Sequence, residues 1–148
     1  MVDVAYRLAH FVNRAAQFGI DSVFISGSYK REEANKLFED FDIPVVVPYG
    51  IENGIGFVER FKKLGVGSNS RTAAEKLFFD ADWKAISKTC MEENFDLFEA
   101  MRAAPSAMNN CGWRFQIFPN KIRVFDTYSD GALDVGIVMA HATKAHLF

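Results

Sequence analysis

The chain has 148 residues, a formal net charge of −2 at pH 7 and 49% hydrophobic residues, with 15 phenylalanines among them. This length predicts one domain over 1–148, and this composition predicts a packed core and excludes a disordered chain. The nearly balanced charge excludes a strongly basic nucleic-acid surface. No apolar run reaches the about 18 residues of a membrane span, so we expect no contact with a membrane.

The spacing of the cysteines and histidines predicts neither a disulfide nor a metal site. Cys90 and Cys111 lie far apart and form no Cys-x-x-Cys pair, so we expect two reduced thiols in a cytoplasmic protein. His141 and His146 are five residues apart, which places them on different sides of a helix at about 100° per residue. His10 stands alone. The sequence therefore predicts no metal site.

The first half of the chain begins with an amphipathic pattern. Apolar residues recur every three or four positions over 4–18, which predicts a helix that ends at Gly19. Its alanines allow close packing, so we expect this helix to be central and largely buried. The next elements expected are a strand over 22–25, a turn over 26–28, a helix over 30–39 and a strand over 44–47. The glycine-rich residues 49–70 predict a loop or an arm.

The second half contains a hairpin between helices. Thr72 and Glu75 have the spacing of a capping box, which predicts a short helix that starts at Thr72. The elements expected after it are a helix over 91–104, strands over 113–118 and 121–125 around a Pro119-Asn120 turn, and a helix over 134–146. This order predicts the α+β class, with helices packed on one mixed or antiparallel sheet.

A polar turn joins the helix over 91–104 to the first strand of the hairpin. It reads Ala103-Ala-Pro105-Ser106-Ala-Met-Asn109 and is followed by Gly112-Trp113. Pro105 ends the helix, and Ser106 and Asn109 place donors and acceptors in a turn. By residue type alone, the same run is explained by a helix stop with an Asx-type turn. Trp113 leads an alternating strand, so we expect it in the core.

This turn resembles the flavin-binding loop of the nitroreductase family, in which Ala-Pro-Ser and Asn precede a Trp-led strand. Residues 5–24 resemble the long helix and the next strand of that family. Asp134-x-Gly136 is similar to a helix found in a branch with two fused nitroreductase-like halves. The resemblance implies a nitroreductase-like fold around a central helix. It covers nearly all of the chain but only part of a full family member, because the Arg-rich opening segment of the family is missing and Gly112 replaces a usual Pro.

The resemblance implies an FMN-dependent oxidoreductase that passes electrons from NAD(P)H to a nitro-aromatic, a quinone or a similar acceptor. No catalytic side chain is obligatory for this chemistry. The residues implied in flavin contacts are Ser26, Gly27, Pro105, Ser106 and Asn109. Arg71 would meet the phosphate, helped by the N-terminus of the helix at Thr72. Arg71 is also explained as a solvated charge, and Gly27 as a turn glycine.

The apolar end of the chain at Leu147 and Phe148 predicts self-association as a homodimer, with flavin binding coupled to dimerisation. The alternative function is a non-catalytic, nitroreductase-like remnant or interaction domain that has lost flavin binding. These two hypotheses differ in one simple property, since only the first protein would be yellow when purified.

Overall fold

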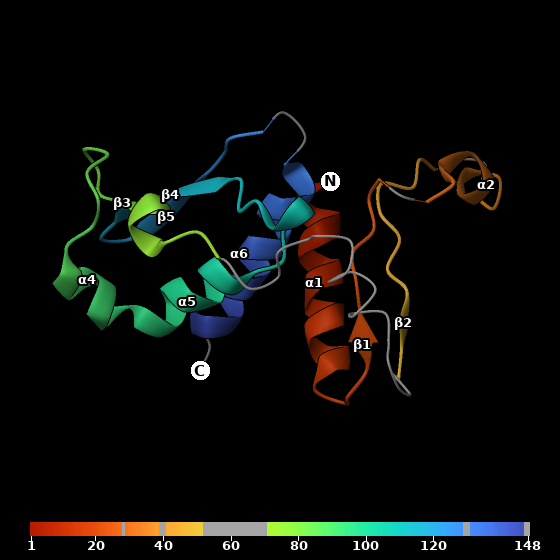
Figure 1. Cartoon of the computed structure of the whole chain (residues 1–148), viewed down its shortest axis with the longest axis horizontal. Helices are drawn as coiled ribbons and strands as arrows, with labels where there is room; N and C mark the ends of the chain where they lie inside the picture. The colour runs from red at the N-terminus through yellow and green to blue at the C-terminus, as the bar shows by residue number, and fades with distance from the viewer. Residues whose placement is uncertain (28, 39–40, 52–70, 129–130, 147–148) are drawn as a thin grey trace. The chain divides into compact units, whose positions relative to one another are not determined.

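The computed structural model describes residues 1–27, 29–38, 41–51, 71–128 and 131–146 (Figure 1). The chain forms two compact units, each described here by itself. Unit 1 comprises Met1–His10 and Val58–Phe148, and unit 2 comprises Phe11–Phe57. Helices and two small sheets make up the described residues, which confirms the α+β class. No helix in these residues is long and apolar enough to cross a membrane.

The first helix, α1, spans Val2–Ala16 and contributes to both units. It ends as the sequence predicts: Gly19 has a φ of 71°, and the Ile20 N–H donates to the Ala15 carbonyl at 3.2 Å. Glycine adopts this left-handed conformation without a Cβ clash, which explains the helix stop at this residue.

Unit 2 contains less regular structure than the sequence predicts. The expected strand over 22–25 is reduced to β1 (Asp21–Ser22), which pairs antiparallel with β2 (Tyr49–Gly50). An isolated bridge joins Ile25 to Val46, so the expected strand over 44–47 is present only as this one pairing. The expected helix over 30–39 is the single short helix α2 (Arg31–Asn35). Of the residues expected to form a loop over 49–70, those at 52–70 lie outside the described residues.

Only one narrow face of α1 is buried in unit 1, so the expectation of a largely buried helix is wrong. Ala5 and Ala9 are each 1% exposed, whereas Val4 is 49% exposed and Leu8 is half-buried. The alanines allow a close approach between backbones, and the larger apolar residues lie beside that contact rather than in it.

The buried face of α1 meets α6 (Ala132–His146) at Gly136. A Cβ placed on Gly136 would lie 2.7 Å from the Ala5 Cβ and would collide with the Val2 carbonyl oxygen. Further along both helices, the Tyr6 hydroxyl donates to Thr143 Oγ1 at 3.4 Å. The two contacts follow the same order along each helix, so α1 and α6 run in the same general direction within unit 1 (Figure 1).

The sheet of unit 1 is mixed. β3 (Phe78–Phe79) runs parallel to β4 (Trp113–Phe118), and β5 (Lys121–Asp126) runs antiparallel to β4 on its other side. The hairpin is therefore confirmed almost to the residue, whereas β3 has no counterpart among the predicted elements. The Phe78 ring stacks on Phe98 at 4.6 Å and on Phe115 at 5.0 Å, and Trp113 is fully buried as expected.

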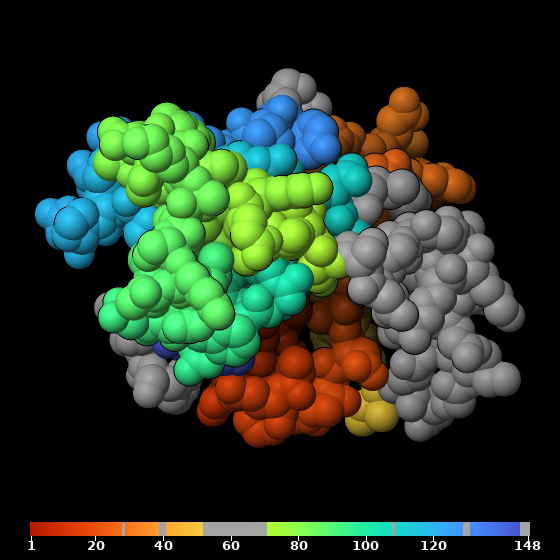
Figure 2. Space-filling model, turned by 60° about the vertical axis from the view of Figure 1, so that its left-hand side comes forward, coloured from red at the N-terminus to blue at the C-terminus, as the bar shows by residue number. Residues whose placement is uncertain are grey.

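The helix predicted over 91–104 is divided in two. α4 (Lys88–Glu93) begins at Ser87, whose hydroxyl accepts the Cys90 N–H at 3.1 Å, and α5 (Phe95–Ala103) follows Asn94 and packs on α6. In Figure 2 the segment over 71–93, coloured yellow-green to green, covers much of the face of unit 1 in view.

The prediction of a helix that starts at Thr72 is wrong. The structure contains only η1 (Ala74–Lys76), a single 3₁₀ turn whose N-cap is Ala73, with no side-chain cap. Three residues in a 3₁₀ turn do not add up to the dipole of a helix, so the expected support for Arg71 from a helix N-terminus is absent here.

Candidate functional site

The candidate site begins where α5 ends, at the buried Ala104. Ala104 has a φ of −55° and a ψ of 139°, an extended conformation that the following Pro105 favours sterically. α5 therefore stops at Ala103, as Pro105 predicts, and the chain turns into η2 (Ala107–Asn109). Pro105 itself is exposed. We call residues 105–111 the polar loop.

Ser106 closes the polar loop on itself. It occupies the N-cap position of η2, but its hydroxyl does not cap that turn. Instead, Ser106 Oγ accepts the N–H of Cys111 at 3.0 Å. A hydroxyl that accepts one hydrogen bond keeps its hydrogen, so Ser106 can still donate to another partner.

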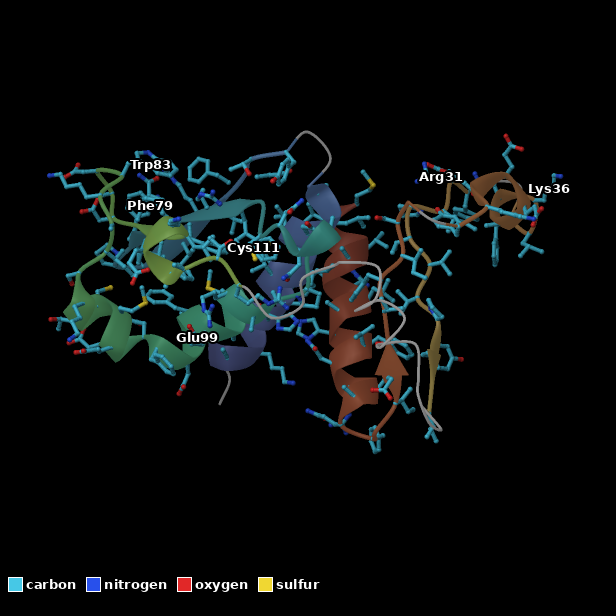
Figure 3. The ribbon with its side chains drawn as sticks, in the orientation of Figure 1. Arg31, Lys36, Phe79, Trp83, Glu99 and Cys111 are labelled. Atoms are coloured by element: carbon cyan, nitrogen blue, oxygen red, sulfur yellow. The ribbon has the colours of Figure 1, made fainter. Side chains whose placement is uncertain are left out.

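Two residues of the polar loop have a left-handed backbone. Asn109 has a φ of 57° and Cys111 a φ of 47°; Cys111 directly precedes Gly112 and β4 (Figure 3). Asparagine tolerates this region, whereas a cysteine there costs on the order of 1–3 kcal/mol. Such strain persists only where the surrounding structure imposes it, and it is concentrated at ligand-binding and catalytic sites.

A carboxylate from α6 holds the middle of the polar loop. The Ala107 N–H donates to both oxygens of Asp134, at 3.1 and 2.9 Å. Asp134 lies in the first turn of α6 and is half-buried. Burial raises the pKa of Asp134, the hydrogen bond from Ala107 lowers that pKa, and the nearby charge of Asp126 raises it further.

Arg71 links the polar loop to a group of basic side chains. Its Nη1 donates to the Ala104 carbonyl at 3.1 Å, immediately before Pro105. Burial lowers the pKa of His141, and the positive charges of Lys144, Arg71 and His10 lower that pKa further. We call these four residues, Arg71, His10, His141 and Lys144, the basic cluster.

The basic cluster is assembled by the crossing of α1 and α6. His10 follows Tyr6 by one turn of α1 and packs against its ring with the centroids 4.6 Å apart. Because Tyr6 reaches Thr143, this turn lies beside the last turns of α6, which carry His141 and Lys144. Among the described residues, no acidic side chain forms an ion pair with any of the four. Arg71 and Lys144 therefore give the cluster a half-buried excess of positive charge.

The structure brings together four of the six residues that the resemblance implies. Arg71, Pro105, Ser106 and Asn109 belong to one continuous region of unit 1. Ser26 and Gly27 belong to unit 2, where both are exposed. A Cβ on Gly27 would have no neighbour within 4 Å among the described residues, so unit 2 by itself does not require a glycine there.

Sequence reasoning missed the contributions of Asp134 and of the histidines. Asp134 is 27 residues from Ala107 in the chain, and no local pattern connects them. His10 and His141 are far apart in sequence, and only the α1–α6 crossing brings His141 near both His10 and Arg71. In the described residues, no three His, Cys, Asp or Glu side chains gather as they would around a metal ion.

Fold and site together define an α+β protein with a strained polar loop attached to a basic cluster. A family model described as "Putative TM nitroreductase" matches residues 1–146. The chain therefore belongs to this nitroreductase-like family, which confirms the resemblance stated above.

The comparison with solved structures supports the fold. The crystal structure of a "putative nitroreductase" from Thermotoga maritima matches with a TM-score of 0.68 at 14% sequence identity. The match covers 97% of this chain and 54% of that protein, so the chain spans about half the length of the structure it resembles. A comparison with curated proteins finds no match.

Proposed function

We propose that this chain forms the flavin-binding part of an FMN-dependent oxidoreductase that uses NAD(P)H to reduce a nitro-aromatic, a quinone or a similar acceptor. One observation carries the proposal. Arg71 binds the carbonyl that precedes the polar loop and belongs at the same time to the basic cluster. A single residue thus connects a region suited to a polar ring system with a region suited to a phosphate.

The donor chemistry of these residues fits FMN. A phosphate monoester is a dianion near neutral pH, and the basic cluster has positive charge without a described acidic partner. The hydroxyl of Ser106 accepts the Cys111 N–H and still has its hydrogen to donate, which suits a ring or ribityl oxygen or nitrogen. When bound, the flavin supplies the redox chemistry by taking up a hydride and passing electrons to the acceptor.

The protein's own residues bind and orient in this proposal. Arg71 and its neighbours neutralise the phosphate, while Ser106 and Asn109 direct polar groups from the strained loop. Pro105 fixes the end of α5 and so the start of that loop. Ser26 and Gly27 stay in the proposal as contacts from unit 2. Cys90 and Cys111 are both unpaired, which supports the proposed reducing, cytoplasmic location.

The first experiment asks whether the protein holds flavin and which one. Purified protein should be yellow, and chromatography of the released cofactor should identify FMN rather than FAD. A colourless protein that takes up neither flavin on titration would refute the proposal and favour the interaction-domain alternative.

The second experiment tests the basic cluster by comparing FMN with riboflavin, which lacks the phosphate. Arg71→Ala should weaken FMN binding by roughly tenfold or more, as expected for the loss of a charge-assisted hydrogen bond, and should change riboflavin binding much less. Arg31→Ala removes the same charge from the exposed helix α2 and serves as the control. Equal losses for FMN and riboflavin would remove Arg71 from the phosphate site.

We also propose that the protein is a homodimer in which flavin binding and dimerisation are coupled. Leu147 and Phe148, on which the sequence argument rests, lie outside the described residues. Support comes instead from unit 2, where seven large apolar side chains among the described residues are more than half exposed: Phe11, Phe18, Leu37, Phe38, Phe41, Tyr49 and Ile51. Apolar surface of this extent is typical of an interaction site.

A further inference from the structure

Asp134 caps the turn η2, because Ser106, the N-cap residue of η2, does not cap it with its side chain. Ser106 stands at the N-cap of η2, but its hydroxyl is occupied by the Cys111 N–H. The first N–H of η2, that of Ala107, is therefore directed to Asp134 in α6. Figure 1 shows the cyan turn of η2 against the start of α6. The polar loop is therefore held by two sets of hydrogen bonds. One lies within the loop, between Ser106 and Cys111, and the other comes from Asp134 in α6.

We propose that Asp134 is a positioning residue for flavin binding: by holding the Ala107 N–H, its carboxylate fixes the direction in which the polar loop presents Ser106 and Asn109. The proposal rests on the FMN function proposed above. Ser106 directly precedes Ala107 and Asn109 ends the same turn, so a rotation of the Ala107 peptide would redirect both side chains.

The electrostatics argue that Asp134 is not placed there for stability. Burial is the largest influence on the pKa of Asp134 and raises it, and the neighbouring carboxylate of Asp126 acts in the same direction. No basic side chain among the described residues forms an ion pair with Asp134. A carboxylate in such surroundings is less favourable when charged than it would be in water, so ionisation of Asp134 costs the fold stability relative to the protonated form.

Stability and flavin binding should consequently respond to Asp134 in opposite directions. A neutral amide in place of the carboxylate removes the cost of burying a charge, yet it accepts the Ala107 N–H less strongly than an anion does. A residue with only a structural role would change both properties in the same direction. This contrast separates positioning from packing.

The experiment compares wild-type protein with Asp134→Asn and with the control Asp96→Asn, which removes an exposed carboxylate from the first turn of α5. Asp134→Asn should bind riboflavin about five- to tenfold more weakly while its melting temperature stays equal or rises. Asp96→Asn should leave flavin binding unchanged. Riboflavin is the probe because it has no phosphate, so titration of the basic cluster contributes little to its affinity.

The pH dependence of riboflavin affinity is a second test, because a purely structural role of Asp134 would not change it. The ionised carboxylate holds the loop, so wild-type affinity for riboflavin should fall as the pH drops through the pKa of Asp134. Asp134→Asn should abolish this dependence. Asp126→Asn removes the charge that faces Asp134 from the end of β5, so it should move the midpoint of the profile to lower pH.

Amide hydrogen exchange tests the hydrogen bond from Ala107 to Asp134 without any flavin. In Asp134→Asn, the Ala107 N–H should exchange faster than in wild-type protein, and amides of the β4–β5 hairpin should keep their rates. If wild-type protein binds riboflavin and Asp134→Asn binds it equally well, with the same pH profile, the positioning role is refuted. If wild-type protein binds no flavin at all, the proposed function is refuted. If the exchange rate of the Ala107 N–H is the same in Asp134→Asn as in wild-type protein, Asp134 does not hold this N–H.

Discussion

At the scale of single residues, the pKa of His141 reports most directly on the positive charge of the basic cluster. Burial first, and then the charges of Lys144, Arg71 and His10, lower the pKa of His141. In the unfolded chain a histidine takes up a proton near pH 6.5, whereas folded His141 resists protonation until lower pH. The unfolded state therefore binds more protons, and the folded state loses stability as the pH falls below about 6.5.

We predict that His141→Gln removes this part of the pH dependence. Thermal melts of the wild-type protein should show the loss below about pH 6.5, and the variant should show a smaller one. Inorganic phosphate or FMN should raise the pKa of His141, because an anion among the four basic side chains favours the protonated ring. Nuclear magnetic resonance titration of the histidine ring protons measures this pKa. An unchanged pKa at saturating FMN would show that the phosphate binds elsewhere.

At the scale of elements, the α1–α6 crossing depends on the missing side chain of Gly136. We predict that Gly136→Ala destabilises the protein by roughly 1–3 kcal/mol, because the added methyl group meets the Val2 backbone and Ala5. This cost exceeds the gain of about 1 kcal/mol in helix propensity. Gly50→Ala is the control, since its Cβ would have no neighbour within 4 Å among the described residues. Denaturant melts that rank the two variants equally would contradict this packing.

Leu8 tests the narrow buried face of α1. A fully buried leucine would cost roughly 2–5 kcal/mol on truncation to alanine, but Leu8 is half-buried. We therefore predict a loss of only about 1 kcal/mol for Leu8→Ala, from the apolar area that it does bury. A circular-dichroism melt gives the value, and a loss above about 2 kcal/mol would show that Leu8 is buried more fully than its exposure in the structure indicates.

The elements also show which sequence patterns were reliable. The β4–β5 hairpin was predictable because alternating residues flank a Pro119-Asn120 turn, so the signal is entirely local. β3 was missed because it has two residues and exists only through its parallel pairing with β4. The capping-box pattern at Thr72 was misleading, since the chain leaves the helical conformation after one 3₁₀ turn.

The same distinction holds for the candidate site. Pro105, Ser106 and Asn109 were found because they form a contiguous motif, and Arg71 was found through the family resemblance. The hydrogen bonds from the Ala107 N–H to Asp134 and the approach of His10 and Arg71 to His141 depend on tertiary contacts. Such contacts leave no periodic trace in a single sequence.

At the scale of the whole molecule, self-association is the main expectation to be tested. We predict a homodimer whose formation FMN promotes, because burial of exposed apolar surface and completion of a flavin site would favour the same assembly. Light scattering at micromolar concentration, with and without FMN, measures this mass. A monomer that binds FMN tightly would refute the coupling, and a monomer without flavin would favour the interaction-domain alternative.

Gly112 constrains which residues can stand together at positions 112 and 128. It replaces the proline usual in the family motif, and the ring of Tyr128 lies where a side chain on Gly112 would have to be. The Gly112 carbonyl also accepts the N–H and the hydroxyl of Thr127, each at 2.7 Å. A proline at this position would have to displace the aromatic ring. Residues 112 and 128 are therefore coupled: any side chain at position 112 requires the Tyr128 ring to take another orientation, so Gly112→Ala should be better tolerated when Tyr128 is also replaced by a small residue.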